Sequence, residues 1–172
     1  MNRAQTPDTE AILLALRERV GGAHVSTDVG QLRIAQADRS GFVSDAAPLC
    51  VVYPSDAAEI SAVLSFANAQ GIPVVTRGAG SGVAGGAMGS TGEIVLSTDR
   101  LNRILSVDAQ NLVARVEAGV LNGFFNSELK KQHLWYAPDP ASRDISSVGG
   151  NIATNAGGLM CAKYGVTHDA VL

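Results

Sequence analysis

The glycine-rich residues from Val74 to Gly86 are the part of the sequence best suited to hold a phosphate group. Glycine lets main-chain N–H groups approach a ligand closely and point inward together, which is how a diphosphate is held without a helix. Arg77, at the entrance of this segment, adds a positive charge. A flexible surface loop that binds nothing would have the same composition, so both interpretations stay open. The candidate binding residues here are Thr76, Arg77, Gly78, Ala79, Gly80, Ser81 and Gly82.

Gly80, Gly82 and Gly85 also match the G-x-G-x-x-G pattern of a nicotinamide-binding Rossmann turn. Such a turn must open a crossover helix. Only seven residues, 86–92, separate the pattern from the apolar strand that begins at Glu93, and three of the seven are glycine. Because each glycine costs about 1 kcal/mol inside a helix, no crossover helix is expected there. We therefore predict a long loop between two strands.

A second cluster of small residues follows after Pro138, and its types suit a flat ring with polar edges. Small side chains let a backbone press against a ring, while amides and hydroxyls bind the polar edge. Asn151 and Asn155 supply the amides. Tight packing between two lobes would also explain the glycines and alanines. The candidate residues are Pro138, Asp139, Ser142, Val148, Gly149, Gly150, Asn151, Ile152, Thr154, Asn155, Gly157 and Gly158.

The elements that position the first cluster read as a parallel βαβ unit. Thr6 and Pro7 are typical of a helix start, and this first helix ends at Gly21 and Gly22. Residues 23–47 show weak periodicity and are expected to be extended. A strand at 50–53 then precedes a helix that Ser55 or Asp56 caps and Gly71 ends, with Ile60, Val63, Leu64 and Ala67 on one face, and a strand follows at 72–76.

The second half contains a strand at 93–97, an alternating strand at 112–117 and a helix that Asn122 caps. That helix is expected to turn Phe125, Leu129 and Phe124 inward. The fold class is α+β with an α/β-like first lobe. We divide the chain into a helix and extended segment at 1–47 and a binding domain at 48–172, whose first lobe covers about 48–105 and whose second begins at about 106.

Composition excludes several classes of function. The 172 residues carry 13 basic and 16 acidic side chains without a run of either sign, so a nucleic-acid or anionic-membrane partner is not expected. The first apolar stretch is far shorter than the roughly 20 residues that span a bilayer, and no leader pattern precedes it, which favours a cytoplasmic protein. Cys50 and Cys161 read as buried thiols rather than metal ligands. No catalytic residue is identified among His24, His133 and His168.

Four ordered motifs together resemble the FAD-binding PCMH-type domain of the FAD-linked oxidases. They are residues 72–82, 136–142, 149–158 and 163–165. The resemblance is to the group that includes glycolate oxidase, D-lactate dehydrogenase and D-2-hydroxyglutarate dehydrogenase. It implies that residues 77–82 cradle the FAD pyrophosphate and that residues 138–142 and 149–158 line the isoalloxazine and ribityl region. Members that attach flavin covalently carry a histidine where this sequence has Ser81, so FAD is expected to be noncovalent.

The resemblance also implies a function that this chain performs only in part. In the family, a 2-hydroxy acid transfers a hydride equivalent to the flavin, and a separate acceptor reoxidises it. The substrate-binding residues of the family lie beyond the equivalent of Leu172, and the second lobe normally continues there. We therefore expect a chain that is inactive alone. Either it is a truncated product or another chain supplies its missing half, and self-association through open strand edges is a further hypothesis. The alternative is a noncatalytic assembly module, which would stay colourless with excess FAD.

Overall fold

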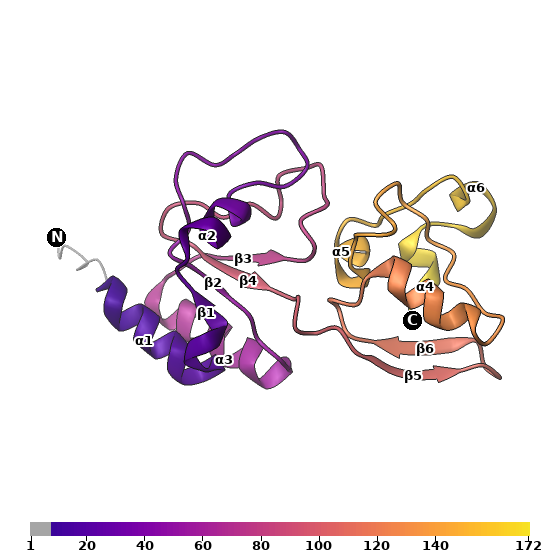
Figure 1. The fold of residues 1–172 in the computed structure, drawn as a ribbon, viewed down its shortest axis with the longest axis horizontal. Coiled ribbons are helices and arrows are strands. Elements are labelled where there is room, and N and C mark those ends of the chain that lie inside the picture. The colour runs from indigo at the N-terminus through magenta and orange to yellow at the C-terminus, as the bar shows by residue number, and fades with distance from the viewer. Residues whose placement is uncertain (1–7) are drawn as a thin grey trace.

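The computed structural model describes residues 8–172, which form two lobes that lie side by side (Figure 1). The first lobe is built on a four-stranded sheet with the order β1-β2-β4-β3. Strand β1 pairs antiparallel with β2, whereas β2 and β3 both pair parallel with β4. Their bounds are Val25–Ser26 for β1, Cys50–Val52 for β2, Val74–Arg77 for β3 and Ile94–Ser97 for β4.

Helices cover both faces of this sheet (Figure 1). Helices α1 (Thr9–Val20) and α3 (Ala57–Gln70) pack on one face, against a core that includes Val52 and Leu96. Helix α2 (Val29–Ala35) covers the other face, where Ala35 packs with Val51 and Val95. Because successive strand residues point to opposite faces, β2 and β4 supply side chains to both cores. The first lobe is therefore a helix, sheet and helix sandwich.

The predicted βαβ unit is confirmed, with β4 inserted between its two strands. Asp56, one of the two expected caps, accepts a hydrogen bond from the Glu59 N–H at 2.8 Å, and Gly71 ends α3 in the left-handed region. Leu64 lies on the exposed side of α3, so its predicted inward position is wrong. Helix α1 is capped by Asp8, whereas the predicted Thr6 and Pro7 start lies outside the described residues.

The prediction that residues 23–47 are extended is wrong. They contain β1, the end of a 3-10 turn (Gly22–His24) and α2, which Asp28 caps by accepting a hydrogen bond from the Gln31 N–H at 2.9 Å. The seven residues of α2 bury only Ala35 and expose Val29 and Ile34, so the helix has no apolar stripe to detect. Helices α1 and α2 and strand β1 pack within the first lobe. The division of the chain at residues 47/48 and at about 105/106 stays a prediction.

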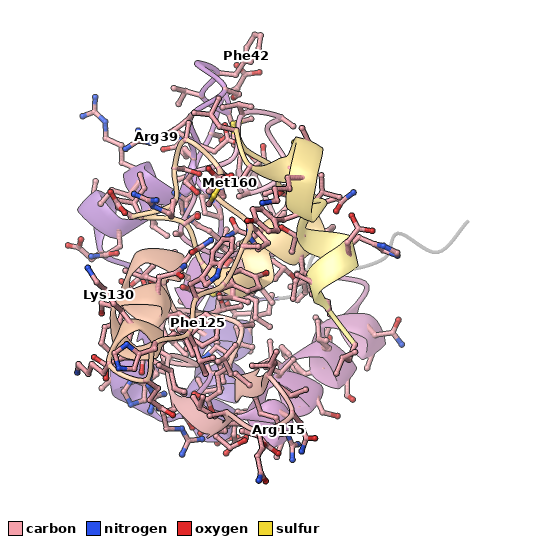
Figure 2. The ribbon with its side chains drawn as sticks, turned by 90° about the vertical axis from the view of Figure 1, so that its right-hand side faces the viewer. Arg39, Phe42, Arg115, Phe125, Lys130 and Met160 are labelled. Carbon is pink, nitrogen blue, oxygen red and sulfur yellow. The ribbon has the colours of Figure 1, made fainter. Side chains whose placement is uncertain are left out.

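The second lobe is built on an antiparallel hairpin, and helices pack against it (Figure 1). The hairpin consists of β5 (Ile104–Asp108) and β6 (Val113–Val116). Helix α4 (Asn122–Lys130) buries Phe125 and Leu129 on it, and Figure 2 shows Phe125 inside the lobe, with Arg115 and Lys130 at the surface. The remaining elements are α5 (Val148–Ala153), α6 (Cys161–Tyr164) and a 3-10 turn (Thr167–Ala170).

Several details of the second lobe differ from the predictions. Strand β5 and helices α5 and α6 were not foreseen. Asn122 is not the cap of α4 but its first residue, and its side chain is fully buried. Phe124 is 50% exposed, and Cys161 is only partly buried. The predicted α+β class with two small lobes is confirmed.

Candidate functional site

The glycine loop, defined here as residues 78–93, joins two neighbouring parallel strands without a helix. It must therefore return along the whole length of β3 before β4 can begin. It does so against the sheet: a β-carbon at Gly89 would lie 3.1 Å from the Pro48 side chain and would also collide with Val95. Since no helix follows Gly85, the structure excludes a nicotinamide-type crossover, as predicted.

The first seven N–H groups of this loop have no hydrogen-bond partner within residues 8–172. Among hydrogen bonds between the described residues, none is donated by a main-chain N–H of residues 78–84. Gly80 adopts φ 65°, a left-handed conformation that side chains disfavour. A run of unpaired main-chain donors around such a turn forms a concave anion site, and it matches the acceptor oxygens of a diphosphate.

The Arg77 side chain is partly buried and makes hydrogen bonds within the protein. Its Nη1 donates hydrogen bonds to the carbonyl oxygens of Ala37 at 2.7 Å and Ala87 at 2.8 Å. Burial lowers the pKa of this guanidinium, while the nearby Asp99 and Asp38 act to raise it. The side chain therefore lies within the base of the loop.

The two small-residue clusters meet at Gly78. A β-carbon there would stand 2.6 Å from Ser147 Oγ and 3.6 Å from the Gly150 Cα. Ser147 caps α5, and its Oγ accepts the Gly150 N–H at 3.2 Å. The next amides of α5 are already used, because Val148 N–H donates to the Val120 carbonyl and Gly149 N–H donates to a carbonyl of the same segment. The meeting point therefore joins β3, the glycine loop and α5.

Part of the second cluster serves tight packing within the second lobe, whereas the alternative interpretation was packing between the two lobes. A β-carbon at Gly149 would stand 2.7 Å from the Ala118 β-carbon, and one at Gly158 would collide with the Asp139 main chain. Asp139 Oδ1 also accepts the Met160 N–H at 3.1 Å, which ties residues 138–142 to the segment after α5. Asn155 Oδ1 accepts the His168 N–H at 2.9 Å, so its amide anchors the 3-10 turn.

The buried polar atoms without a hydrogen-bond partner among the described residues include Nδ2 of Asn151 and Oγ of Ser146. Both residues are 2% exposed. A buried donor without a partner costs about 1–3 kcal/mol, so such atoms indicate an acceptor that a ligand supplies. Together with the free amides of the glycine loop, they fit a cofactor that carries both phosphate and ring acceptors.

Asn122 and Asn126 were not predicted as part of the site, yet they position it. Asn122 Nδ2 donates to the Pro138 carbonyl at 3.0 Å, and its Oδ1 accepts a bond from Asn126 Nδ2 at 2.8 Å. Asn126 Oδ1 in turn accepts the Tyr136 N–H at 2.8 Å. Because both amide side chains belong to α4, this network fixes the position of residues 136–138 against that helix. The spacing of four residues between the two asparagines was the available signal.

The predicted residues differ in their exposure, and this limits what each can contact. Pro138, Val148 and Asn151 are buried, whereas Thr76, Ala79, Ile152, Thr154 and Asn155 are exposed. The remaining members are partly buried: Arg77, Gly78, Gly80, Ser81, Gly82, Asp139, Ser142, Gly149, Gly150, Gly157 and Gly158. Thr154 Oγ1 donates to the Gly150 carbonyl at 2.9 Å, so it stabilises the end of α5.

Other kinds of site find no support in residues 8–172. No group of three or more His, Cys, Asp or Glu side chains in this part of the chain is placed to hold a metal ion. Within the same residues, no helix has the length and apolar character needed to cross a membrane.

Comparison with known proteins gives the family. A family model described as an FAD binding domain matches residues 48–172. The chain belongs to this family. It is 37% identical over 160 residues to the glycolate oxidase subunit GlcD of Escherichia coli strain K12, an alignment that covers 93% of this chain and 32% of that protein. It is 38% identical over 134 residues to a D-lactate dehydrogenase of Anaerostipes hadrus, covering 78% of this chain and 28% of the relative.

The FAD domain also agrees in fold with solved structures. An alkyldihydroxyacetonephosphate synthase superposes with a TM-score of 0.82 at 21% identity, over 98% of this chain and 33% of that one. Identity this low shows the fold alone. The expected family is confirmed, and the chain is an FAD-binding domain of the glycolate oxidase and D-lactate dehydrogenase type. It spans about a third of the length of the relatives that it matches.

Proposed function

We propose that this chain holds FAD for a flavin-dependent 2-hydroxy-acid dehydrogenase or oxidase. The observation that carries the proposal is the run of free main-chain amides at 78–84, which lies beside the second cluster at Gly78. The relatives, a glycolate oxidase subunit and a D-lactate dehydrogenase, support the substrate class.

Each cluster has a distinct part in the proposal. The amides of residues 78–82 bind the pyrophosphate, while residues 138–142 and 148–158 line the isoalloxazine and ribityl region. Asn151 Nδ2, a buried donor without a partner, fits one of the cofactor's acceptor atoms. The bound flavin supplies the hydride acceptor, and this chain binds, orients and shields it from water. Thr76 and Arg77 set the direction in which the loop leaves β3.

We further propose that FAD is bound without a covalent link through the loop, since Ser81 occupies the position of the attachment histidine. Acid precipitation of the flavin-loaded protein is expected to leave all flavin in the supernatant. Flavin that stays with the precipitated chain would contradict this assignment.

Turnover by these residues alone is not expected, because catalysis requires a substrate held in a reactive geometry. Adding a 2-hydroxy acid to the flavin-loaded chain under anaerobic conditions should leave the flavin absorbance unchanged. Bleaching by D-lactate or glycolate would show that the substrate site is already complete.

The test of the cofactor proposal is an FAD titration followed through Trp135, the single tryptophan of the chain. Trp135 is half-exposed beside Tyr136, which the Asn122 and Asn126 network places at the second cluster. We expect quenching that saturates, and a stabilisation of about 2.7 kcal/mol when FAD reaches about 100 times its Kd. Gly80→Ala should weaken binding, whereas the matched control Gly86→Ala, whose β-carbon would meet nothing within 4 Å, should bind normally. A folded chain that does not bind FAD would favour the alternative, a noncatalytic assembly module.

Self-association and a cytoplasmic location also stay proposals. Strands β5 and β6 pair only with each other among the described residues, and Leu105 and Leu112 are exposed along this hairpin. An open strand edge is a ready template for pairing with another chain. Light scattering of the purified chain across a concentration series tests for a dimer, and cell fractionation tests the location.

A further inference from the structure

Arg77 connects three segments at the base of the glycine loop. Its Nη1 donates to the Ala87 carbonyl at 2.8 Å, which joins the start of the loop to a position ten residues later. The same nitrogen donates to the Ala37 carbonyl at 2.7 Å, in the segment that follows α2. Both acceptors are main-chain carbonyls. The guanidinium therefore fixes the position of the backbone at Ala37 and Ala87 and does not bind another side chain through these bonds.

Gly80 lies directly over this guanidinium. A β-carbon at position 80 would collide with Nη2 of Arg77 and would stand 2.6 Å from its Cζ and 3.1 Å from its Nε. Gly80 also has a φ of 65°. The loop therefore rests on the flat face of the Arg77 side chain at the residue where it turns, and a glycine is needed there for space as well as for conformation.

Further hydrogen bonds tie the loop to residues 35–44, which run beside it (Figure 1). The Arg39 N–H donates to the Gly82 carbonyl at 2.9 Å, and the Gly89 N–H donates to the Ala35 carbonyl at 2.8 Å. Ser44 Oγ donates to the Gly89 carbonyl at 2.6 Å. The Arg39 side chain itself points to the surface (Figure 2). All these bonds use groups other than the N–H groups of residues 78–84, which stay available for a ligand.

Carboxylates offset the charge of Arg77. Against the lowering effect of burial, the charges of Asp99 and Asp38 raise the pKa of its guanidinium. One carboxylate oxygen of Asp38 is buried without a hydrogen-bond partner among the described residues. Both hydrogen bonds that the guanidinium makes among the described residues come from Nη1, and Gly80 of the loop lies over Nη2.

We propose that Arg77 is a positioning residue for FAD: it braces the glycine loop so that the amides of residues 78–84 are held ready for the pyrophosphate. The inference rests on the proposed function of this loop. Holding a loop in its bound conformation raises affinity by reducing the ordering cost of binding. Lysine cannot replace arginine here, because a single ammonium group has neither the planar face nor the fixed fork of donors.

The first test needs no cofactor. Hydrogen exchange of the full chain without FAD is compared for wild type, Arg77→Lys and Gly86→Ala. We expect Arg77→Lys to speed exchange of the bonded Arg39 and Gly89 N–H groups by about tenfold or more, the factor that corresponds to losing hydrogen bonds from a charged group. The buried amides of α3 report global stability and should change little. Unchanged exchange at Arg39 and Gly89 would overturn the brace.

The second test separates bracing from phosphate binding. FAD and riboflavin, which lacks phosphates, are titrated into wild type, Arg77→Lys, Arg77→Gln and Gly80→Ala. A brace predicts that all three variants lose FAD affinity by about tenfold or more and riboflavin affinity much less. Retained FAD affinity in Arg77→Lys would instead assign Arg77 a charge contact with phosphate, and equal losses for both ligands would mean a general structural role.

The outcomes also distinguish the two proposals. A wild-type chain that binds neither ligand contradicts the proposed function, while the exchange experiment still decides whether Arg77 braces the loop. If the Arg77 variants do not fold, Gly80→Ala keeps the arginine and disturbs the same contact. Gly80→Ala with wild-type exchange and wild-type FAD affinity would then overturn the inference.

Discussion

Gly78 and Ser147 lie so close together that a β-carbon at Gly78 would stand 2.6 Å from Ser147 Oγ. We predict that Gly78→Ala destabilises the protein by about 1–3 kcal/mol, as overpacking usually does, and weakens FAD binding because the two clusters meet here. The other contacts of the new methyl group, at 3.6 Å and 3.7 Å from Gly150, are ordinary. Urea unfolding and the Trp135 titration measure the two effects.

The control for this prediction is a double-mutant cycle. Ser147→Ala removes the colliding oxygen but also the α5 cap, which costs about 1 kcal/mol. In that background Gly78→Ala should cost clearly less than in wild type, which gives a coupling of about 0.5–3 kcal/mol. Strictly additive effects would show that the two residues do not touch.

The buried Asn122 network yields a stability prediction. Asn122→Ala removes the donor to the Pro138 carbonyl and the acceptor for Asn126, so we expect a loss of about 2–3 kcal/mol in the free energy of unfolding. The exposed Asn102, whose Nδ2 donates to the Asp99 carbonyl, is the matched control, and its alanine variant should change stability by less than about 0.5 kcal/mol. Similar effects of the two variants would refute the positioning role of the network.

The ion pair of Glu117 with Arg103 predicts a dependence on pH. Hydrogen bonds from the Arg103 side chain and main chain lower the pKa of Glu117 below its ordinary value of 4.5. A carboxyl group with a lowered pKa stabilises the fold above its unfolded pKa, and this contribution is lost as the pH falls through the folded value. The difference in Tm between wild type and Glu117→Gln should therefore be constant near neutral pH and shrink at pH values well below 4.5. A difference that is independent of pH from 7 to 3 would contradict the assignment.

The two cysteines should differ in reactivity. Burial raises the pKa of the Cys50 thiol to about 12, and this residue is fully buried in the first-lobe core. Since the thiolate is the reactive species, we expect iodoacetamide at pH 8 to modify the partly buried Cys161 and to spare Cys50 until the chain unfolds. Peptide mass spectrometry of native and urea-treated samples identifies the labelled site. Rapid native labelling of Cys50 would show that the first lobe opens.

Local chemistry made part of the fold predictable. The cap and the end of α3 follow from Asp56 and Gly71, whose preferences act over a few residues. The absence of a helix after Gly85 follows from the glycines themselves, because each one adds to the cost of helix formation. Features of this kind depend on neighbours in the chain, so the sequence displays them directly.

Distant contacts decide the features that the sequence did not display. Helix α5 contains two glycines, and the Ala118 and Val120 carbonyls bind its first amides from another part of the chain. Asn122 suits a helix cap by type, but burial against Pro138 gives it a different task. The direction of the Arg77 side chain depends on Ala37, forty residues earlier in the chain. No local pattern contains that information.

The strand order β1-β2-β4-β3 bears on how the protein is made on the ribosome. Strands β2 and β3 have no hydrogen-bonded contact with each other, and each waits for β4, the last strand of the sheet to be synthesised. Between the end of β3 at Arg77 and the end of β4 at Ser97 the ribosome adds 20 residues, which takes about 1–4 s at about 5–20 residues per second. During that interval β3 has no strand partner, and β2 can pair only with β1. The glycine loop is synthesised within this interval. The segment proposed to hold the pyrophosphate must therefore be made before β4 can complete the sheet.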